Sequence, residues 1–268
     1  MTEWQASEYS RQSGLQMAMA QRQLGRLTLA GDERVLDIGC GDGNITAEIA
    51  LRVPQGSAVG VDPSREMIAF AAGQFSSPTY QNLQFEVADA RSIPYRDEFD
   101  LIVSFNALHW VPEQLTALTA IRQALKPGGR ALLRMVYLGA RRSLEAVIEE
   151  VRLRSPWAGH FADFQQPFAH FEPSEYQALA EQAGLTVVRV ELEDQAWDFE
   201  TRAGFVAFAR VTFVEWTQHL PDVDRDQFIG DVLDTYAAVA ADTPAEANTF
   251  KFYQMEVELL RADEDAQQ

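Results

Sequence analysis

A glycine-rich turn beside acidic side chains is the part of this sequence best suited to binding chemistry. The stretch from Val35 to Gly43 reads Val-Leu-Asp-Ile-Gly-Cys-Gly-Asp-Gly. Its apolar half is typical of a buried strand in a parallel sheet, and its glycines allow the backbone to approach a ligand closely. Asp37 and Asp42 lie here with no Lys or Arg before the helical pattern that follows. The turn therefore favours an ammonium or sulfonium ligand over a pyrophosphate.

The spacing of the glycines also argues against a dinucleotide. Gly39, Gly41 and Gly43 give G-x-G-x-G, whereas the dinucleotide fingerprint is G-x-G-x-x-G. Asp62 ends the next apolar run about 20 residues further on, the usual place for an acid that binds ribose hydroxyls. Asp89 follows a third short strand pattern. Because parallel strands end at one edge of a sheet, we expect these acids to surround one ligand there.

Five motifs in order resemble those of class I S-adenosylmethionine-dependent methyltransferases. They are Val-Leu-Asp-Ile-Gly-Cys-Gly-Asp-Gly, Gly-Val-Asp-Pro-Ser, Ala-Asp-Ala, Phe-Asp-Leu-Ile-Val-Ser and Leu-Lys-Pro-Gly-Gly, and they extend from about residue 31 to residue 136. The resemblance implies S-adenosylmethionine as cofactor and S-adenosylhomocysteine as product. The alternative is a doubly wound domain that binds some other nucleotide.

The resemblance also implies which residues contact the cofactor. These residues are Asp37, Gly39, Gly41, Asp62, Pro63, Met67, Asp89, Ala90 and Asn106. Asp37 and the glycines would hold the methionine end of the cofactor, Asp62 the ribose and Asp89 the adenine amino group. Met67 either packs on the adenine or belongs to the core.

A second stretch with chemical potential follows the predicted strand Phe99–Phe105 and reads Asn-Ala-Leu-His-Trp. With the Val-Pro that follows and a glutamine at position 114, it resembles the equivalent turn of juvenile hormone acid and trans-aconitate methyltransferases, which esterify carboxylic acids. In that branch a tryptophan and an N-terminal glutamine hold the acceptor carboxylate, which implies these roles for Trp110 and Gln16. His109 is either a base or a packing residue.

The methyl acceptor decides whether a base is needed. A carboxylate is ionised near neutral pH and requires only orientation, whereas an alcohol or a phenol must lose a proton. We therefore predict O-methylation of a small, lipophilic or acidic molecule, most simply a carboxylic acid. One alternative is methylation of a hydroxyl or phenol with His109 as base, and another is a non-catalytic sensor of S-adenosylmethionine. The predicted catalytic residues are His109, Trp110 and Gln16, and the predicted acceptor contacts are Tyr9, Gln16, His109, Trp110, Trp157 and Phe161.

Composition limits the other possible functions. The formal net charge is −18, which would repel a nucleic acid. The single cysteine, Cys40, is compatible with a reducing compartment and precludes an internal disulfide. The N-terminus lacks the layout of a signal peptide, no apolar run reaches membrane-spanning length, and no cluster has metal-ligand spacing. We expect a cytoplasmic monomer or homodimer without a metal or a membrane partner.

The predicted fold class is α/β, with a doubly wound, seven-stranded, mostly parallel sheet whose last strand is antiparallel. We expect one methyltransferase domain over residues 1–268: an N-terminal helical lid at 1–30, a cofactor-binding core at 31–138, a cap insertion at 139–172, the rest of the sheet with added helices at 173–260, and a tail at 261–268. The insertion is rich in aromatic residues, which fits either a satellite core or a cap over the acceptor. Arg134, inside a predicted strand, is expected to pair with a structural carboxylate.

Overall fold

The computed structural model describes residues 19, 22 and 24–262, and within them the chain folds around one sheet in the order β3-β2-β1-β4-β5-β7-β6. The first five strands are parallel, and β7 is antiparallel to both of its neighbours. This confirms the predicted fold class. The strands are β1 (Arg34–Ile38), β2 (Ser57–Asp62), β3 (Leu83–Val87), β4 (Phe99–Phe105), β5 (Leu125–Val136), β6 (Thr186–Asp198) and β7 (Thr249–Leu260).

The central strands form where the sequence has short apolar runs, because both faces of a parallel sheet are covered. The start of β5 has an unusual sequence. Lys-Pro-Gly-Gly is typical of a turn, but β5 begins at Leu125, directly after a helix. Leu125 pairs with Phe99, and a register shift before Leu101 absorbs the irregular backbone. Gly129 fits there because a Cβ at this position would lie 2.9 Å from the Phe99 carbonyl oxygen.

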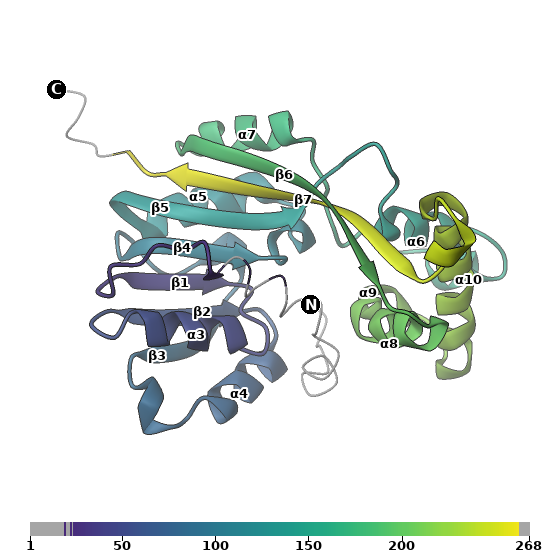
Figure 1. Ribbon diagram of the computed structural model, residues 1–268, viewed down its shortest axis with the longest axis horizontal. Helices are drawn as coiled ribbons and strands as arrows, with labels where there is room; N and C mark the ends of the chain where they lie inside the picture. Colours follow the sequence, from purple (N-terminus) through teal and green to yellow (C-terminus); the bar gives the residue numbers. More distant parts are fainter. Residues whose placement is uncertain (1–18, 20–21, 23, 263–268) are drawn as a thin grey trace.

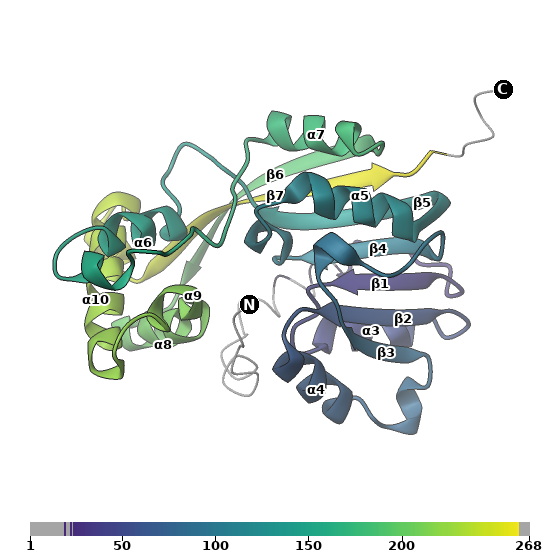
Figure 2. The same ribbon diagram turned by 180° about the vertical axis from the view of Figure 1, so that it is seen from behind.

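Helices cover both faces of the sheet. Figure 1 shows α3 in front of the strands, and Figure 2 shows α5 in front of them from behind. Ser64 caps α4 and Ser143 caps α6 by accepting backbone N–H groups, as helix-starting serines do. The helices are α3 (Asn44–Arg52), α4 (Arg65–Gln74), α5 (Gln114–Ala124), α6 (Leu144–Arg152), α7 (Pro173–Gln182), α8 (Arg202–Thr212), α9 (Val214–Thr217) and α10 (Asp222–Ala240).

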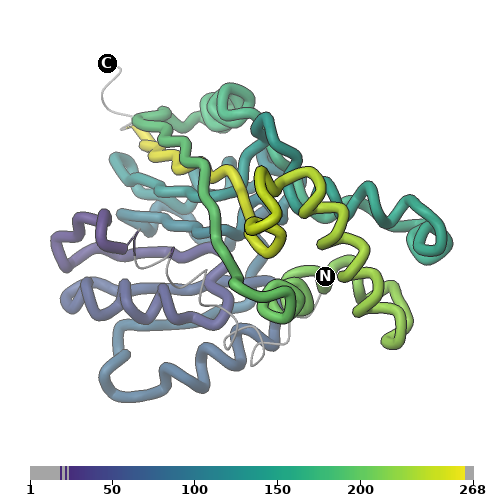
Figure 3. Tube along the Cα trace, turned by 45° about the vertical axis from the view of Figure 1, so that its right-hand side comes forward, coloured from purple at the N-terminus to yellow at the C-terminus, as the bar shows by residue number. Residues whose placement is uncertain are grey.

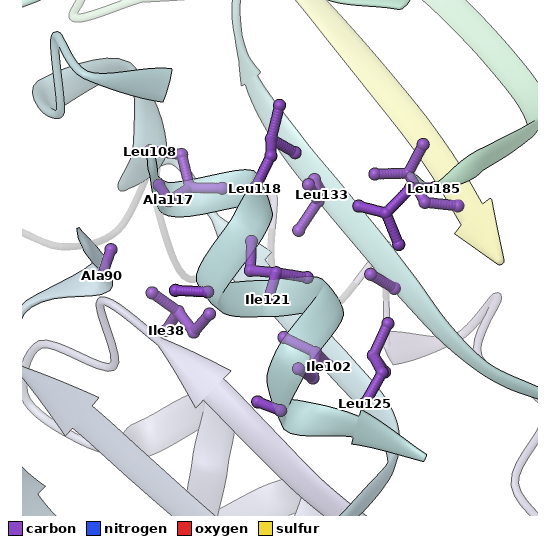
Figure 4. Packing of buried hydrophobic residues seen from close by; sticks show 14 of the residues in the cluster. Ile38, Ala90, Ile102, Leu108, Ala117, Leu118, Ile121, Leu125, Leu133 and Leu185 are labelled. Atoms are coloured by element: carbon purple, nitrogen blue, oxygen red, sulfur yellow. The ribbon is translucent and has the colours of Figure 1, made fainter. Parts of the chain in front are cut away.

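The main core lies between the sheet and α5. Leu118 and Ile121 of α5 pack with Leu133 of β5, and all three are fully buried (Figure 4). Burying side chains of this size contributes about 1.5–3 kcal/mol each. Leu108, in the turn after β4, is also buried in this cluster, so its side chain fixes the turn to the main core.

A second core holds the helical part, which we define as α6, α8, α9, α10 and the short 3₁₀ turn η4 (Trp157–His160). The helical part lies beyond the carboxyl ends of the parallel strands, and the long antiparallel strands β6 and β7 reach into it (Figures 1 and 3). Phe250 and Phe252 of β7 belong to its core. In the described part of the chain, no helix is long and apolar enough to cross a membrane.

Candidate functional site

The glycine turn after β1 is held against its neighbours by backbone contacts. The N–H groups of Gly39 and Cys40 donate to the Val61 carbonyl at 2.8 and 3.0 Å. Gly39 has φ of +75°, and a Cβ there would lie 2.1 Å from the Cβ of Ala107. Only glycine therefore allows the turn after β1 to lie against the turn after β4. A Cβ on Gly41 would meet nothing within 4 Å, so open space adjoins the turn at this residue.

Asp62, at the end of β2, joins two loops through its carboxylate. One oxygen accepts the Gly41 N–H at 3.1 Å, and the other accepts the Ser64 N–H at 2.9 Å. Each carboxylate oxygen can accept more than one hydrogen bond. Asp62 therefore retains acceptor capacity for hydroxyl groups while it supports the glycine turn.

Asp37 lies buried beneath the same turn. Its carboxylate accepts a hydrogen bond from the Thr46 hydroxyl at 2.7 Å. Burial, reinforced by the negative charge of Asp62, raises the pKa of Asp37 to about 7 despite that hydrogen bond. Burial also raises the pKa of the Cys40 thiol well above its usual value, which leaves Cys40 an inert small residue. The two neighbouring acids, Asp37 and Asp62, favour the binding of a positively charged group beside the turn.

The remaining predicted cofactor contacts occupy the same edge of the sheet. Asp89 accepts three hydrogen bonds from Arg91, and that guanidinium lowers the pKa of Asp89. Met67 is 3% exposed, in the first turn of α4, and its backbone N–H donates to Ser64. Ala90 is buried in the main core beside the edge. Pro63 lies between the Asp62 carboxylate and the α4 cap.

A cavity opens where the helical part meets the ends of β4 and β5. Its internal volume is about 100 Å³, and its mouth is open to solvent. Six of the residues that line it are aromatic, and the described lining residues include no Lys or Arg. The lining residues are Met19, Asn106, His109, Trp110, Val136, Leu144, Glu145, Ile148, Phe208, Thr212, Phe213, Trp216, Phe250, Phe252 and Gln254. Its composition, mostly apolar and aromatic with a few polar groups, is that of a small-molecule pocket.

His109 and Trp110 lie side by side in this cavity, as does Asn106. His109 and Trp110 belong to the 3₁₀ turn η3 (Leu108–Trp110), and Asn106 lies just before it. The side chain of Gln114 stabilises this turn by donating to the carbonyls of Leu108 and Val111 at 2.5 and 2.6 Å. His109 is buried, which lowers its pKa to about 3, and its Nδ1 has no hydrogen-bond partner. Its ring centroid lies 5.3 Å from that of Trp110 and 6.0 Å from that of His170.

Trp157 and Phe161, predicted to contact the acceptor, do not line the cavity. Trp157 donates its ring N–H to Asp231 of α10 at 2.9 Å. Both rings pack on Phe228, with centroids 5.4 and 5.8 Å away. These aromatic residues of the insertion therefore serve the core of the helical part, because a hydrogen bond and ring contacts turn them towards α10. Tyr9 and Gln16 lie outside the described residues.

Sequence reasoning missed most of the cavity wall, although some of it follows a simple period. Phe250, Phe252 and Gln254 alternate along β7 and share one face. Phe208, Thr212 and Trp216 recur every fourth position across α8 and α9. These periods identify a face, but the sequence does not say that the two faces meet.

A buried polar network supports the cavity from the side of the sheet. Arg134 contacts Glu193 at 2.6 Å and Glu256 at 3.6 Å, which confirms the predicted pairing with structural carboxylates. Its Nε donates to Gln254 at 2.5 Å, and Gln254 donates in turn to Asn106. The Asn106 N–H also donates to the Arg134 carbonyl at 2.8 Å, so the residue is held through both its backbone and its side chain.

No group of three or more His, Cys, Asp or Glu side chains within the described ranges is arranged to hold a metal ion.

Comparisons with known proteins add to this geometry. Residues 35–129 match a family described as "Methyltransferase domain". The chain is 26% identical over 233 residues to putative methyltransferase 235L of Invertebrate iridescent virus 6, covering 87% of this chain and 85% of that protein. It is 44% identical over 98 residues to a trans-aconitate 2-methyltransferase of Streptomyces avermitilis, covering only 36% of each chain.

Solved structures share the fold at low sequence identity. The YcgJ protein of Bacillus subtilis superposes with a TM-score of 0.65 at 19% identity, covering 92% of this chain and 99% of that one. A phosphoethanolamine N-methyltransferase 2 of Haemonchus contortus, solved with S-adenosylhomocysteine, gives a TM-score of 0.63 at 16% identity, covering 96% of this chain and 57% of that one.

Proposed function

Because this chain is a class I S-adenosylmethionine-dependent methyltransferase, we propose that it methylates a carboxylate oxygen of a small, largely apolar acid bound in the cavity. The observation that carries the proposal is the character of the polar groups in the cavity wall. Asn106, Trp110 and Gln254 are neutral, and His109, in the turn after β4, is a poor base because its pKa is about 3. Glu145 of α6 is the one acidic side chain among the described lining residues. Such a wall suits a nucleophile that is already ionised.

The residues of the glycine turn fit the cofactor. Open space adjoins Gly41, and the two buried or half-buried acids, Asp37 and Asp62, suit its positive charges. We assign Asp37, Gly39 and Gly41 to its methionine end, Asp62 to its ribose and Asp89 to its adenine. Pro63, Met67 and Ala90 would complete the contacts. When bound, the cofactor supplies a methyl group on a positively charged sulfur.

The turn after β4 links the two ligands. Gly39 and Ala107 are in contact range, so the methionine end of the cofactor and the Asn106–Trp110 turn adjoin. The Trp110 and Asn106 side chains would orient an acceptor carboxylate there, and the aromatic walls would exclude water. The carboxylate oxygen forms a bond to the methyl carbon while the carbon–sulfur bond breaks and its electron pair stays on sulfur. No proton needs to move, so this transfer requires no base.

A panel of acceptors tests the proposal. We expect release of S-adenosylhomocysteine with lipophilic carboxylic acids and none with matched phenols and alcohols, and the product should hydrolyse in mild base as an ester does. His109→Gln should keep kcat/KM on the best acid within about tenfold of wild type, because a base would instead contribute 10²–10⁴-fold. Turnover of phenols that His109→Gln abolishes would replace the carboxylate with a hydroxyl acceptor. Tight cofactor binding without any turnover would favour a sensor.

A further inference from the structure

Glu145 is the one acidic side chain among the described residues that line the cavity. It stands in the first turn of α6 and is 9% exposed. The other acidic residues of α6 are paired: Glu149 with Arg152 at 2.6 Å, and Glu150 with Arg142 and Arg154. The carboxylate of Glu145 makes no hydrogen bond or ion pair to any residue that the structure describes.

The charge of Glu145 affects two neighbouring groups, His170 and Tyr236. Tyr236 is also affected by Arg141, whose guanidinium is paired with Asp194. Burial lowers the pKa of His170, so this imidazole is neutral near pH 7, and its Nε2 is itself buried without a partner. The hydroxyl of Tyr236 is occupied, since it donates to the Lys251 carbonyl at 2.6 Å.

The carboxylate of Glu145 lines a cavity that is open to solvent, and a ligand that fills the cavity would displace that solvent. A carboxylate that is removed from water without gaining a partner is strongly disfavoured, and its place near the helix N-terminus offsets only a small part of that cost. We therefore expect the bound ligand to supply the partner.

We propose that Glu145 is a specificity-determining residue, whose carboxylate binds a hydrogen-bond donor, an ammonium or a hydroxyl group, carried by the methyl acceptor. This inference rests on the proposed function and names the acceptor class more narrowly: an acid with an apolar middle and a donor at its other end. The direction in which the acceptor lies in the cavity follows from charge. Its reacting carboxylate is repelled by Glu145 and attracted to the neutral amides of Asn106 and Gln254. The aromatic walls suit the apolar middle and favour a cation at the Glu145 end.

The test compares octanoic acid with 8-hydroxyoctanoic and 8-aminooctanoic acid. Affinities are measured by calorimetry on protein saturated with S-adenosylhomocysteine, and kcat/KM is measured with S-adenosylmethionine. Wild type should prefer both substituted acids to octanoate by about tenfold or more, as expected when a buried polar group is otherwise left unpaired. Glu145→Gln should remove the preference for the ammonium, and Glu145→Leu should make octanoate the best of the three. The ratio of the two substituted acids in wild type shows whether charge or hydrogen bonding dominates.

Glu150→Gln, on the exposed side of the same helix, is the matched control and should leave all three ratios unchanged. Equal preferences in wild type and Glu145→Gln, or octanoate as the best ligand of wild type, would overturn the inference even if acids are methylated. Octylamine and octanol, which lack a carboxylate, separate the two hypotheses. If they bind through Glu145 and are themselves methylated while acids are not, the carboxylate proposal fails instead.

Discussion

The proposed cofactor edge and the proposed acceptor cavity of this protein are built in opposite ways. The polar groups that line the glycine turn come from residues 37 to 62, and each has a hydrogen bond nearby: Asp62 accepts the Gly41 N–H, and Asp37 accepts the Thr46 hydroxyl. The cavity draws its walls from residues as far apart as Asn106 and Gln254, and packing rather than hydrogen bonding joins most of them. Substitutions should therefore act sharply and locally at the cofactor edge and more gradually in the cavity.

The largest effect is expected at Gly39. Gly39→Ala adds positive-φ strain of about 1–2 kcal/mol and a collision with Ala107, and should lower the free energy of unfolding by about 2–4 kcal/mol in all. Cofactor affinity should fall with it. Urea unfolding and calorimetry measure both. Gly41→Ala is the matched control, since it carries the strain without the collision and should cost only about 1–2 kcal/mol. Equal costs at the two positions would contradict the tight contact between the turns after β1 and β4.

Asp62→Ala should separate the two regions. Loss of charge-assisted hydrogen bonds worth about 1.5–3 kcal/mol each should weaken S-adenosylmethionine binding tenfold or more. The KM of the acceptor should stay within about twofold, because Asp62 does not line the cavity. Calorimetry and steady-state kinetics give the two numbers. Wild-type cofactor affinity in this variant would remove the ribose assignment.

The raised pKa of Asp37 predicts how cofactor affinity depends on pH. With a pKa of about 7, this side chain is protonated in acid and must ionise to favour a cation. Affinity should therefore rise with pH by up to about tenfold per unit below pH 7 and level off above it. Asp37→Asn should reduce the part of this pH dependence of cofactor affinity that comes from the protein.

The same raised pKa of Asp37 also affects the stability of the ligand-free protein. It contributes stability that is complete below about pH 4 and is lost as pH rises through 7. A pH-independent difference between wild type and Asp37→Asn would contradict this assignment.

The smallest effect is expected at Trp157, within the helical part but away from the cavity. Trp157→Phe loses the N–H that binds Asp231 and should reduce the free energy of unfolding by about 1 kcal/mol while the acceptor KM stays within about twofold. Trp216→Phe is the matched comparison, because Trp216 lines the cavity, and its KM should change by about tenfold. If Trp157→Phe altered KM as much as Trp216→Phe, the boundary between core and cavity would need to be redrawn.

The sequence by itself determined the fold class and the cofactor. Gly39, Gly41, Asp37 and Asp62 are recognisable because they lie within a few residues of strand ends, and strand ends are visible as breaks in apolar runs. The pairing of Arg134 with carboxylates was also predictable, since a charge inside a central strand requires a partner.

Only the tertiary structure decided which residues form the cavity that we propose for the acceptor. Trp157 and Trp216 both belong to the core of the helical part and both donate a ring N–H to a carboxylate, yet only Trp216 also lines the cavity. Glu145 looks like an ordinary acid in the first turn of a helix until its burial and its lack of a partner are known. The physical reason is that hydrophobic packing is not directional: an apolar face signals that it will be buried but not which surface will cover it.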